Sequence, residues 1–137
     1  MNVLMFLKDK KQVAYLYDTN TLRQGLKKMK AHGYTAIPVL RRDGTYAGSV
    51  SEGDFLRYIL DHSCEDIREQ EAALIQDIIR PDFIRPVKIN ASMEYLFQCS
   101  MNQNFIPVTD DRNFFIGIVT RQDIIRGFLK ERQGDKI

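Results

Sequence analysis

Two segments of the 137-residue chain place a hydroxyl, a carboxylate and an arginine at the same spacing. Residues 48–57 read GSVSEGDFLR and residues 117–126 read GIVTRQDIIR. A helix start favours an anion, and a hydroxyl there can donate to a phosphate oxygen. A carboxylate one turn later can accept hydrogen bonds from both hydroxyls of a ribose. The pattern predicts two nucleoside phosphate sites, one at Ser51 and Asp54 and one at Thr120 and Asp123.

Helix capping is an alternative reading of the same residues. A serine or threonine before a helix, followed by an acidic residue in the first turn, satisfies backbone N–H groups without any ligand. Pro38 and Pro107, which precede the two segments, either mark edge positions of a sheet or interrupt strand pairing so that backbone groups face a purine. Both readings stay open at this level.

The two segments belong to a longer internal repeat. Residues 33–60 align without a gap with residues 102–129, at an offset of 69 positions. Eight of the 28 aligned positions are identical, whereas about two identities are expected from ordinary residue frequencies. One structural unit is therefore expected to occur twice.

Each copy has the expected element order β-α-β-β-α. Strands are indicated by β-branched and aromatic residues, helices by apolar residues at helical spacing, and the hairpin by Asp43-Gly44. In the first copy we expect strands at 12–17, 36–40 and 46–50 and helices from Thr21 and Ser51. In the second we expect strands at 86–89, 105–108 and 115–119 and helices from Ser92 and over 121–132.

The expected boundaries are residues 1–61 for the first repeat with a short N-terminal helix, 62–80 for an ordered helical connector, 81–133 for the second repeat and 134–137 for a tail. A unit of about 60 residues buries little surface alone. We therefore expect an α+β fold whose two repeats pack sheet to sheet with pseudo-twofold symmetry, and clefts between the repeats suited to small ligands.

The tandem pattern, I-P-V followed by G-x-V-[ST]-x-x-D-x-x-R, resembles a pair of cystathionine-β-synthase (CBS) domains, or Bateman module, over about Gln12 to Leu129. The resemblance implies a regulatory module that binds adenosine nucleotides such as AMP, ADP, ATP or cyclic di-AMP and requires no other cofactor. It also implies a homodimer and a separate effector protein.

The resemblance further implies roles for individual residues. Asp54 and Asp123 would hold ribose, while Ser51 and Thr120 would approach phosphate. The backbone at Ala36-Ile37 and at Phe105-Ile106 would meet the adenine. Arg57 and Arg126 would reach phosphates or a partner chain.

The two copies differ in charge between the hydroxyl and the carboxylate. Glu52 stands beside the first expected phosphate position and would repel it, whereas Arg121 at the equivalent position would attract it. The site of Thr120 and Asp123 is therefore expected to be the better phosphate site. Pro86, in the first strand of the second copy, stands near an expected adenine contact and alters that slot.

Composition excludes several other classes. Twenty basic and eighteen acidic residues leave a net charge of +2, which does not indicate a nucleic-acid or membrane partner. Cys64 and Cys99 form no CxxC or Cys/His cluster, so neither a disulfide framework nor a zinc site is indicated. The sequence lacks the nucleotide-hydrolase, dinucleotide and metalloprotease motifs, so we expect no enzyme.

Without a signal peptide or membrane span, the expected location is cytoplasmic. The alternative function is a protein-interaction or dimerisation module that binds no nucleotide.

Overall fold

The computed structural model describes residues 2–80 and 82–134, which form two compact units. The first unit spans Ala14–Ile84. The second unit combines Met1–Val13 with Arg85–Ile137. Each unit contains one copy of the repeat.

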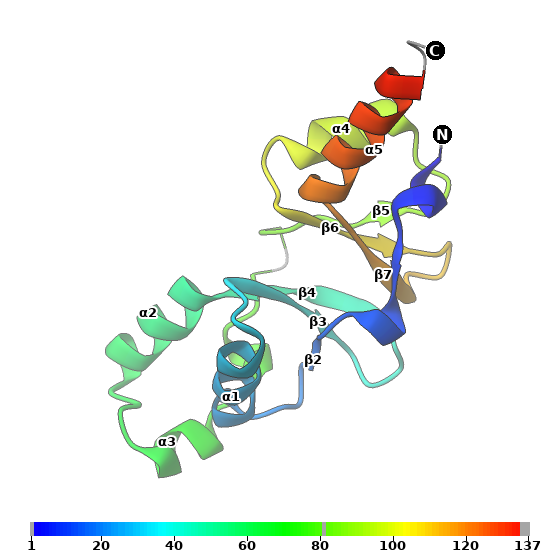
Figure 1. The fold of residues 1–137 in the computed structure, drawn as a ribbon. Coiled ribbons are helices and arrows are strands. Elements are labelled where there is room, and N and C mark those ends of the chain that lie inside the picture. Colours follow the sequence, from blue (N-terminus) through cyan, green and yellow to red (C-terminus); the bar gives the residue numbers. More distant parts are fainter. Residues whose placement is uncertain (1, 81, 135–137) are drawn as a thin grey trace. The chain divides into compact units, whose positions relative to one another are not determined.

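The first unit packs helices against a three-stranded sheet of order β2-β3-β4 (Figure 1). Strands β2 and β3 are parallel, and β3 and β4 form an antiparallel hairpin. Its elements are β2 (Leu16–Tyr17), α1 (Leu22–His32), β3 (Ala36–Leu40), β4 (Tyr46–Ser51), α2 (Glu52–His62), α3 (Ile67–Ala72) and the 3₁₀ helix η3 (Ile75–Asp77).

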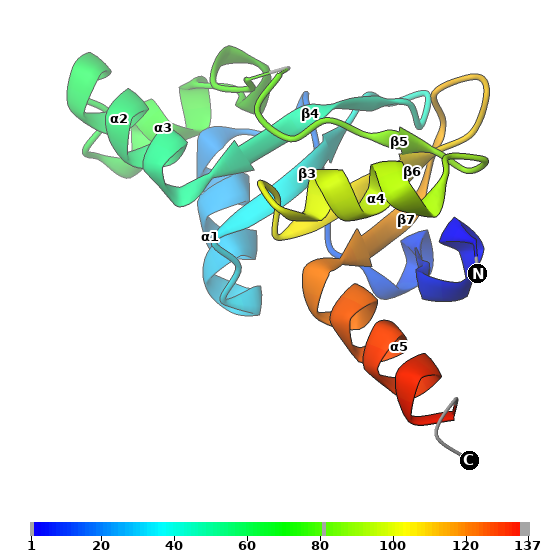
Figure 2. The same ribbon diagram turned by 90° about the horizontal axis from the view of Figure 1, so that it is seen from above.

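The second unit has a four-stranded sheet of order β1-β7-β6-β5, with α4 and α5 on the same face of it (Figures 1 and 2). Its elements are the 3₁₀ helix η1 (Val3–Phe6), β1 (Lys8–Asp9), the 3₁₀ helix η2 (Lys10–Gln12), β5 (Val87–Lys88), α4 (Met93–Ser100), β6 (Phe105–Thr109), β7 (Phe115–Thr120) and α5 (Arg121–Gly134).

The internal repeat extends to the detail of the backbone. The β3–β4 hairpin shifts register between Val39 and Leu40, and the β6–β7 hairpin shifts at the equivalent pair, Val108 and Thr109. The hairpin turns place Gly44 and the equivalent Asn113 at positive φ, 95° and 68°. Glycine and asparagine are the residues that tolerate this conformation best. The expected α+β fold with two β-α-β-β-α repeats is confirmed.

Helix starts follow the local signals in the sequence. Thr21 and Gln24 form a capping box at the start of α1, and Ser51 and Asp54 form one at the start of α2. Each box satisfies backbone N–H groups that a helix leaves unpaired at its first turn. These contacts fix the direction in which α2 leaves the end of β4.

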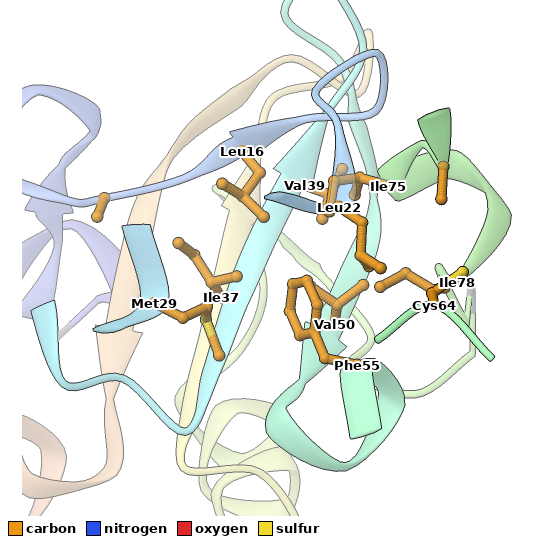
Figure 3. Close-up of a cluster of buried hydrophobic side chains, with 12 residues drawn as sticks. Leu16, Leu22, Met29, Ile37, Val39, Val50, Phe55, Cys64, Ile75 and Ile78 are labelled. Carbon is orange, nitrogen blue, oxygen red and sulfur yellow. The ribbon is translucent and has the colours of Figure 1, made fainter. Parts of the chain in front are cut away.

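Each unit has its own hydrophobic core. Figure 3 shows the first, in which Phe55 from α2 and Leu22 from α1 lie against Val50 of the sheet. The second core joins α4, α5 and the N-terminal segment to the sheet through Leu96, Ile124 and Val3, among others. The cores hold the starts of α2 and α5 in equivalent places beside their hairpins.

The N-terminal segment corrects one expected boundary. Residues 1–13 belong to the second unit, not to the first repeat. β1 pairs antiparallel with β7, where Gly117 permits the approach because a Cβ there would overlap the Lys8 carbonyl. Val3 is fully buried in the second core. The N-terminal segment therefore joins the second unit through contacts with residues that are distant in sequence.

The outer strands are shorter than expected. Of residues 12–17 only Leu16–Tyr17 form a strand, because Lys10–Gln12 turn into a 3₁₀ helix capped by Asp9. Of residues 86–89 only Val87–Lys88 do so. The connector is ordered by α3 and η3, as expected, whereas residues 135–137 of the expected tail lie outside the described residues. Sheet-to-sheet packing of the repeats stays a prediction.

Candidate functional site

The first expected site, named the first crevice, is defined by Asp54 and its contacts, and the Asp54 side chain is only 4% exposed. Its Oδ1 accepts from Arg57 Nη2 at 2.8 Å and lies 2.7 Å from Arg80 Nε. Its Oδ2 accepts from Ser51 N at 2.8 Å, Ser51 Oγ at 3.0 Å and Arg80 Nη2 at 3.3 Å. An ionised carboxylate offers about four lone-pair positions, so these contacts occupy its capacity to accept hydrogen bonds.

Electrostatics keep Asp54 ionised. Burial acts to raise the pKa of Asp54, but hydrogen bonds from Ser51, Arg80 and Arg57 outweigh it, and the net effect lowers the pKa. Donors to a charged carboxylate favour its charged form. Asp54 is therefore a paired anion and not a proton donor.

The connector positions Arg80. The backbone of Arg80 pairs with Ser49 of β4 in an isolated antiparallel bridge, and its guanidinium lies 4.0 Å from the centre of the Phe83 ring. Four residues further on, the Tyr46 hydroxyl donates to the Ile84 carbonyl at 2.7 Å. Burial raises the pKa of Tyr46, which keeps this donor protonated. The chain is thus fixed to β4 both at Arg80 and at Ile84.

The second crevice is centred on Asp123, and its side chain is 22% exposed. Lys8 Nζ lies 3.5 Å from Oδ2, and Arg126 Nη1 lies 3.6 Å from Oδ1. The backbone N–H of Asp123 donates to Thr120 Oγ1 at 3.1 Å, so Thr120 caps α5. Asp123 keeps lone pairs available that Asp54 has already used.

Asp123 lines a hollow of about 720 Å³. This volume lies within the usual range for small-molecule pockets, about 300–1,000 Å³. Its lining combines apolar residues of the N-terminal segment with charged residues of both signs from β1 and α5. The lining residues are Met5, Phe6, Leu7, Lys8, Asp123, Arg126, Gly127, Lys130 and Glu131.

Lys8 and Arg80 occupy equivalent positions that the sequence analysis missed. Lys8 pairs with Ile118 of β7, and Arg80 bridges to Ser49, which is the equivalent residue of β4. Each cation reaches the aspartate of its own unit. The signal lies outside the aligned 28 residues, because a basic residue follows an apolar pair in both Phe6-Leu7-Lys8 and Ile78-Ile79-Arg80.

Thr120 and Arg121 line a different hollow from Asp123. Together with Asn104, Gln122 and Ile125 they border a space of about 410 Å³. Arg121 Nε donates to the Ser100 carbonyl at 2.6 Å, which ties this arginine to the end of α4. Asp123 and Arg126 therefore line one hollow and Thr120 and Arg121 line another, although Thr120 Oγ1 accepts from the Asp123 backbone N–H.

The four residues expected to meet adenine lie at the starts of β3 and β6. Ala36 pairs with Ser51, and Phe105 pairs with Thr120 at the equivalent register. The neighbouring Ile37 and Ile106 are fully buried in the two cores. Neither residue is therefore exposed to a ligand, backbone included, whereas Ala36 and Phe105 are half-buried.

Residues 2–80 and 82–134 contain no group of three or more histidine, cysteine or acidic side chains placed to hold a metal ion. No helix within the same ranges is long and apolar enough to cross a membrane.

Comparison with known proteins gives concordant results. A curated relative, cyclic di-AMP receptor B of Bacillus subtilis, is 25% identical over 125 residues, covering 91% of this chain and 84% of the relative. A crystal structure of CbpB in complex with c-di-AMP matches with a TM-score of 0.89 at 22% identity, covering 100% of this chain and 91% of the other.

A crystal structure of CBSX2 in complex with AMP matches with a TM-score of 0.75 at 20% identity, covering 96% of this chain and 98% of the other. At such identities the two structures establish a common fold. The family model described as "CBS domain" matches residues 9–61 and 75–130, which together span most of the sequence. The chain belongs to the CBS-domain family and carries two copies of the domain.

Proposed function

We propose that the protein binds an adenosine nucleotide in the crevice of its second unit and acts as a regulatory module. The observation that carries this proposal is that Asp123 lines a hollow of about 720 Å³ together with Lys8, Arg126 and Lys130. A carboxylate with available lone pairs can accept from the two hydroxyls of a ribose, and three cations can hold phosphate oxygens.

The apolar side of the hollow suits a base. Met5, Phe6 and Leu7 contribute to its lining. An aromatic ring and a thioether are favourable neighbours for a flat ligand ring. Support from other proteins is that the Bacillus subtilis relative is called a cyclic di-AMP receptor, and that two proteins of similar fold were solved with c-di-AMP and AMP.

The role that we propose for the bound nucleotide is regulatory. A ligand changes an equilibrium only through its different affinities for two states. The regulatory output therefore requires an effector protein that distinguishes the loaded form from the empty form. A cytoplasmic location stays a prediction.

A thermal-shift screen with AMP, ADP, ATP, cyclic di-AMP and GTP tests the proposal. At a concentration of 100 Kd, a bound nucleotide stabilises the folded state by about 2.7 kcal/mol, which raises the Tm of a chain of this size by about 8 °C. Asp123→Asn should remove the shift, whereas Asp54→Asn should keep it. Absence of a shift with every adenosine compound contradicts the proposal, and an equal shift with GTP contradicts the adenine assignment.

A second candidate function, homodimerisation, is favoured by an exposed apolar row on each of α2 and α5. Leu56 and Leu60 are 58% and 63% exposed, and the equivalent Ile125 and Leu129 are both 52% exposed. A charged residue stands one helical turn before each row, and the two charges are opposite in sign. Glu52 precedes the row on α2, whereas Arg121 precedes the row on α5. We infer that α2 of one copy lies parallel to α5 of a second copy, because a parallel α2–α2 pair would place two glutamates together and a parallel α5–α5 pair two arginines.

Sedimentation of charge-reversed variants tests this pairing. Glu52→Arg should weaken the dimer, since it would oppose Arg121 of the second copy, and Glu52→Arg combined with Arg121→Glu should restore it. If α2 instead faced α2, the single and double variants would show no such rescue. A chain that is monomeric at every concentration would contradict this second function.

A further inference from the structure

Arg80 reaches Asp54 from the connector. Ser51 and Arg57, in contrast, contact Asp54 from the end of β4 and from α2. Arg80 Nε lies 2.7 Å from Oδ1, and its Nη2 donates to Oδ2 at 3.3 Å. The guanidinium thus spans both oxygens of the carboxylate. A two-point contact of this kind is stronger and more directional than a single bond.

A ribose would need the same two oxygens. Ser51 already donates to Oδ2 through both its backbone N–H and its hydroxyl. With Arg57 and Arg80 on Oδ1, the carboxylate has no lone pair left for a sugar hydroxyl. The Ser51 hydroxyl likewise spends its proton on Asp54 and cannot donate it to phosphate.

The hollow beside Arg80 has a different lining from the hollow at Asp123. A hollow of about 420 Å³ at this place is lined by Ile79, Arg80, Asp82 and Phe83. Neither Asp54 nor Ser51 is among its lining residues. In the second unit, by contrast, Asp123 itself lines the hollow.

Contacts with β4 and with the residues that follow Arg80 hold its side chain in place. The bridge to Ser49, the Phe83 ring under the guanidinium and the hydrogen bond from Tyr46 to Ile84 act together. The residue of the second unit equivalent to Tyr46 is Phe115, which has no hydroxyl. Phe115 therefore cannot form the hydrogen bond that Tyr46 donates to Ile84.

We propose that Arg80 is an internal occupant of the first crevice, so that each chain binds nucleotide through the second unit alone until Arg80 is replaced. This inference rests on the proposed function for the class of ligand. It assigns Arg80 as the residue that determines which of two homologous crevices is open. Lys8, its equivalent, approaches Asp123 at 3.5 Å from a single nitrogen and leaves that carboxylate accessible.

Isothermal titration calorimetry of the full chain with AMP, and separately with cyclic di-AMP, tests the inference. Arg80→Ala should double the amount of nucleotide bound per chain relative to the wild type. Asp123→Asn should abolish binding, and Arg80→Ala combined with Asp123→Asn should return it to the wild-type stoichiometry. Arg68→Ala, which removes one exposed positive charge from the connector, is the matched control and should change nothing.

Arg80→Gln, which keeps most of the side-chain length, provides a second variant, and circular dichroism checks the fold of both. A folded Arg80 variant with unchanged or reduced stoichiometry overturns the inference, because Arg80 would then be irrelevant to the ligand or would hold it. If the wild type binds through Asp123 in that case, the proposed function stands. Binding by Arg80→Ala alone would overturn the second-unit site and keep the role of Arg80.

Discussion

The two crevices show how one motif can be used in two ways. In the first unit the aspartate is nearly buried and held by donors from α2 and from the connector, while in the second it is 22% exposed and flanked by two longer ion pairs. Both aspartates stand at equivalent helix positions. The difference arises from the cation that reaches each aspartate from a distant part of the chain, which is Arg80 for Asp54 and Lys8 for Asp123.

Helix capping, one of the two alternatives that the sequence left open, is present in both repeats. Asp54 completes a capping box with Ser51. Thr120 caps α5 through the backbone of Asp123, and the Asp123 carboxylate lines a hollow. The same motif thus places its carboxylate in two different environments.

The largest expected effect is a difference between Asp54 and Asp123 in their contribution to the free energy of unfolding. Asp54→Ala should lower the free energy of unfolding by about 2 kcal/mol, because it removes a cap contact and leaves two arginines without their partner. Asp123→Ala should cost less than about 1 kcal/mol without ligand, since its ion pairs are more exposed. Urea unfolding measures both, and equal losses would contradict the contrast between the crevices.

A smaller loss of stability is expected from a substitution at Gly127, which lines the second crevice. A Cβ at Gly127 would overlap the Phe6 ring, so Gly127→Ala should displace the N-terminal segment and cost about 1 kcal/mol, with weaker nucleotide binding. Urea unfolding and calorimetry measure the two effects.

The matched control for Gly127 is Gly53, near the start of α2. A Cβ at Gly53 would lie 3.2 Å from a movable guanidinium nitrogen of Arg57. Gly53→Ala should therefore be neutral or stabilise by about 0.5 kcal/mol. A larger loss for Gly53→Ala than for Gly127→Ala would show that the N-terminal segment does not depend on close approach to α5.

The smallest effect concerns acid. Because the pKa of Asp54 is lowered in the folded state, its stabilising contribution is present above the unfolded pKa of about 3.9 and is lost as the pH falls through the lower folded value. Wild-type stability should therefore fall more steeply below pH 4 than that of Asp54→Asn. Arg80→Ala should show a shallower fall than the wild type, since one donor is gone. Superimposable pH profiles of the wild type and Asp54→Asn would refute this.

Sequence patterns predicted the repeated unit well, because its signals are local. The capping residues Thr21 and Ser51, the turn at Gly44 and the apolar positions of β3 and β6 act over a few residues, and the structure has them as expected. The charge difference between Glu52 and Arg121 also pointed to unequal crevices. Their roles toward phosphate stay predictions.

The sequence alone determined that the chain contains two copies of one β-α-β-β-α unit, each with a hydroxyl and a carboxylate at a helix start. Only the tertiary structure decided what surrounds those carboxylates. Lys8 and Arg80 reach Asp123 and Asp54 across 115 and 26 positions of the chain. Residues so distant in sequence meet through strand pairing and core burial, and no local pattern specifies which cation will meet which aspartate.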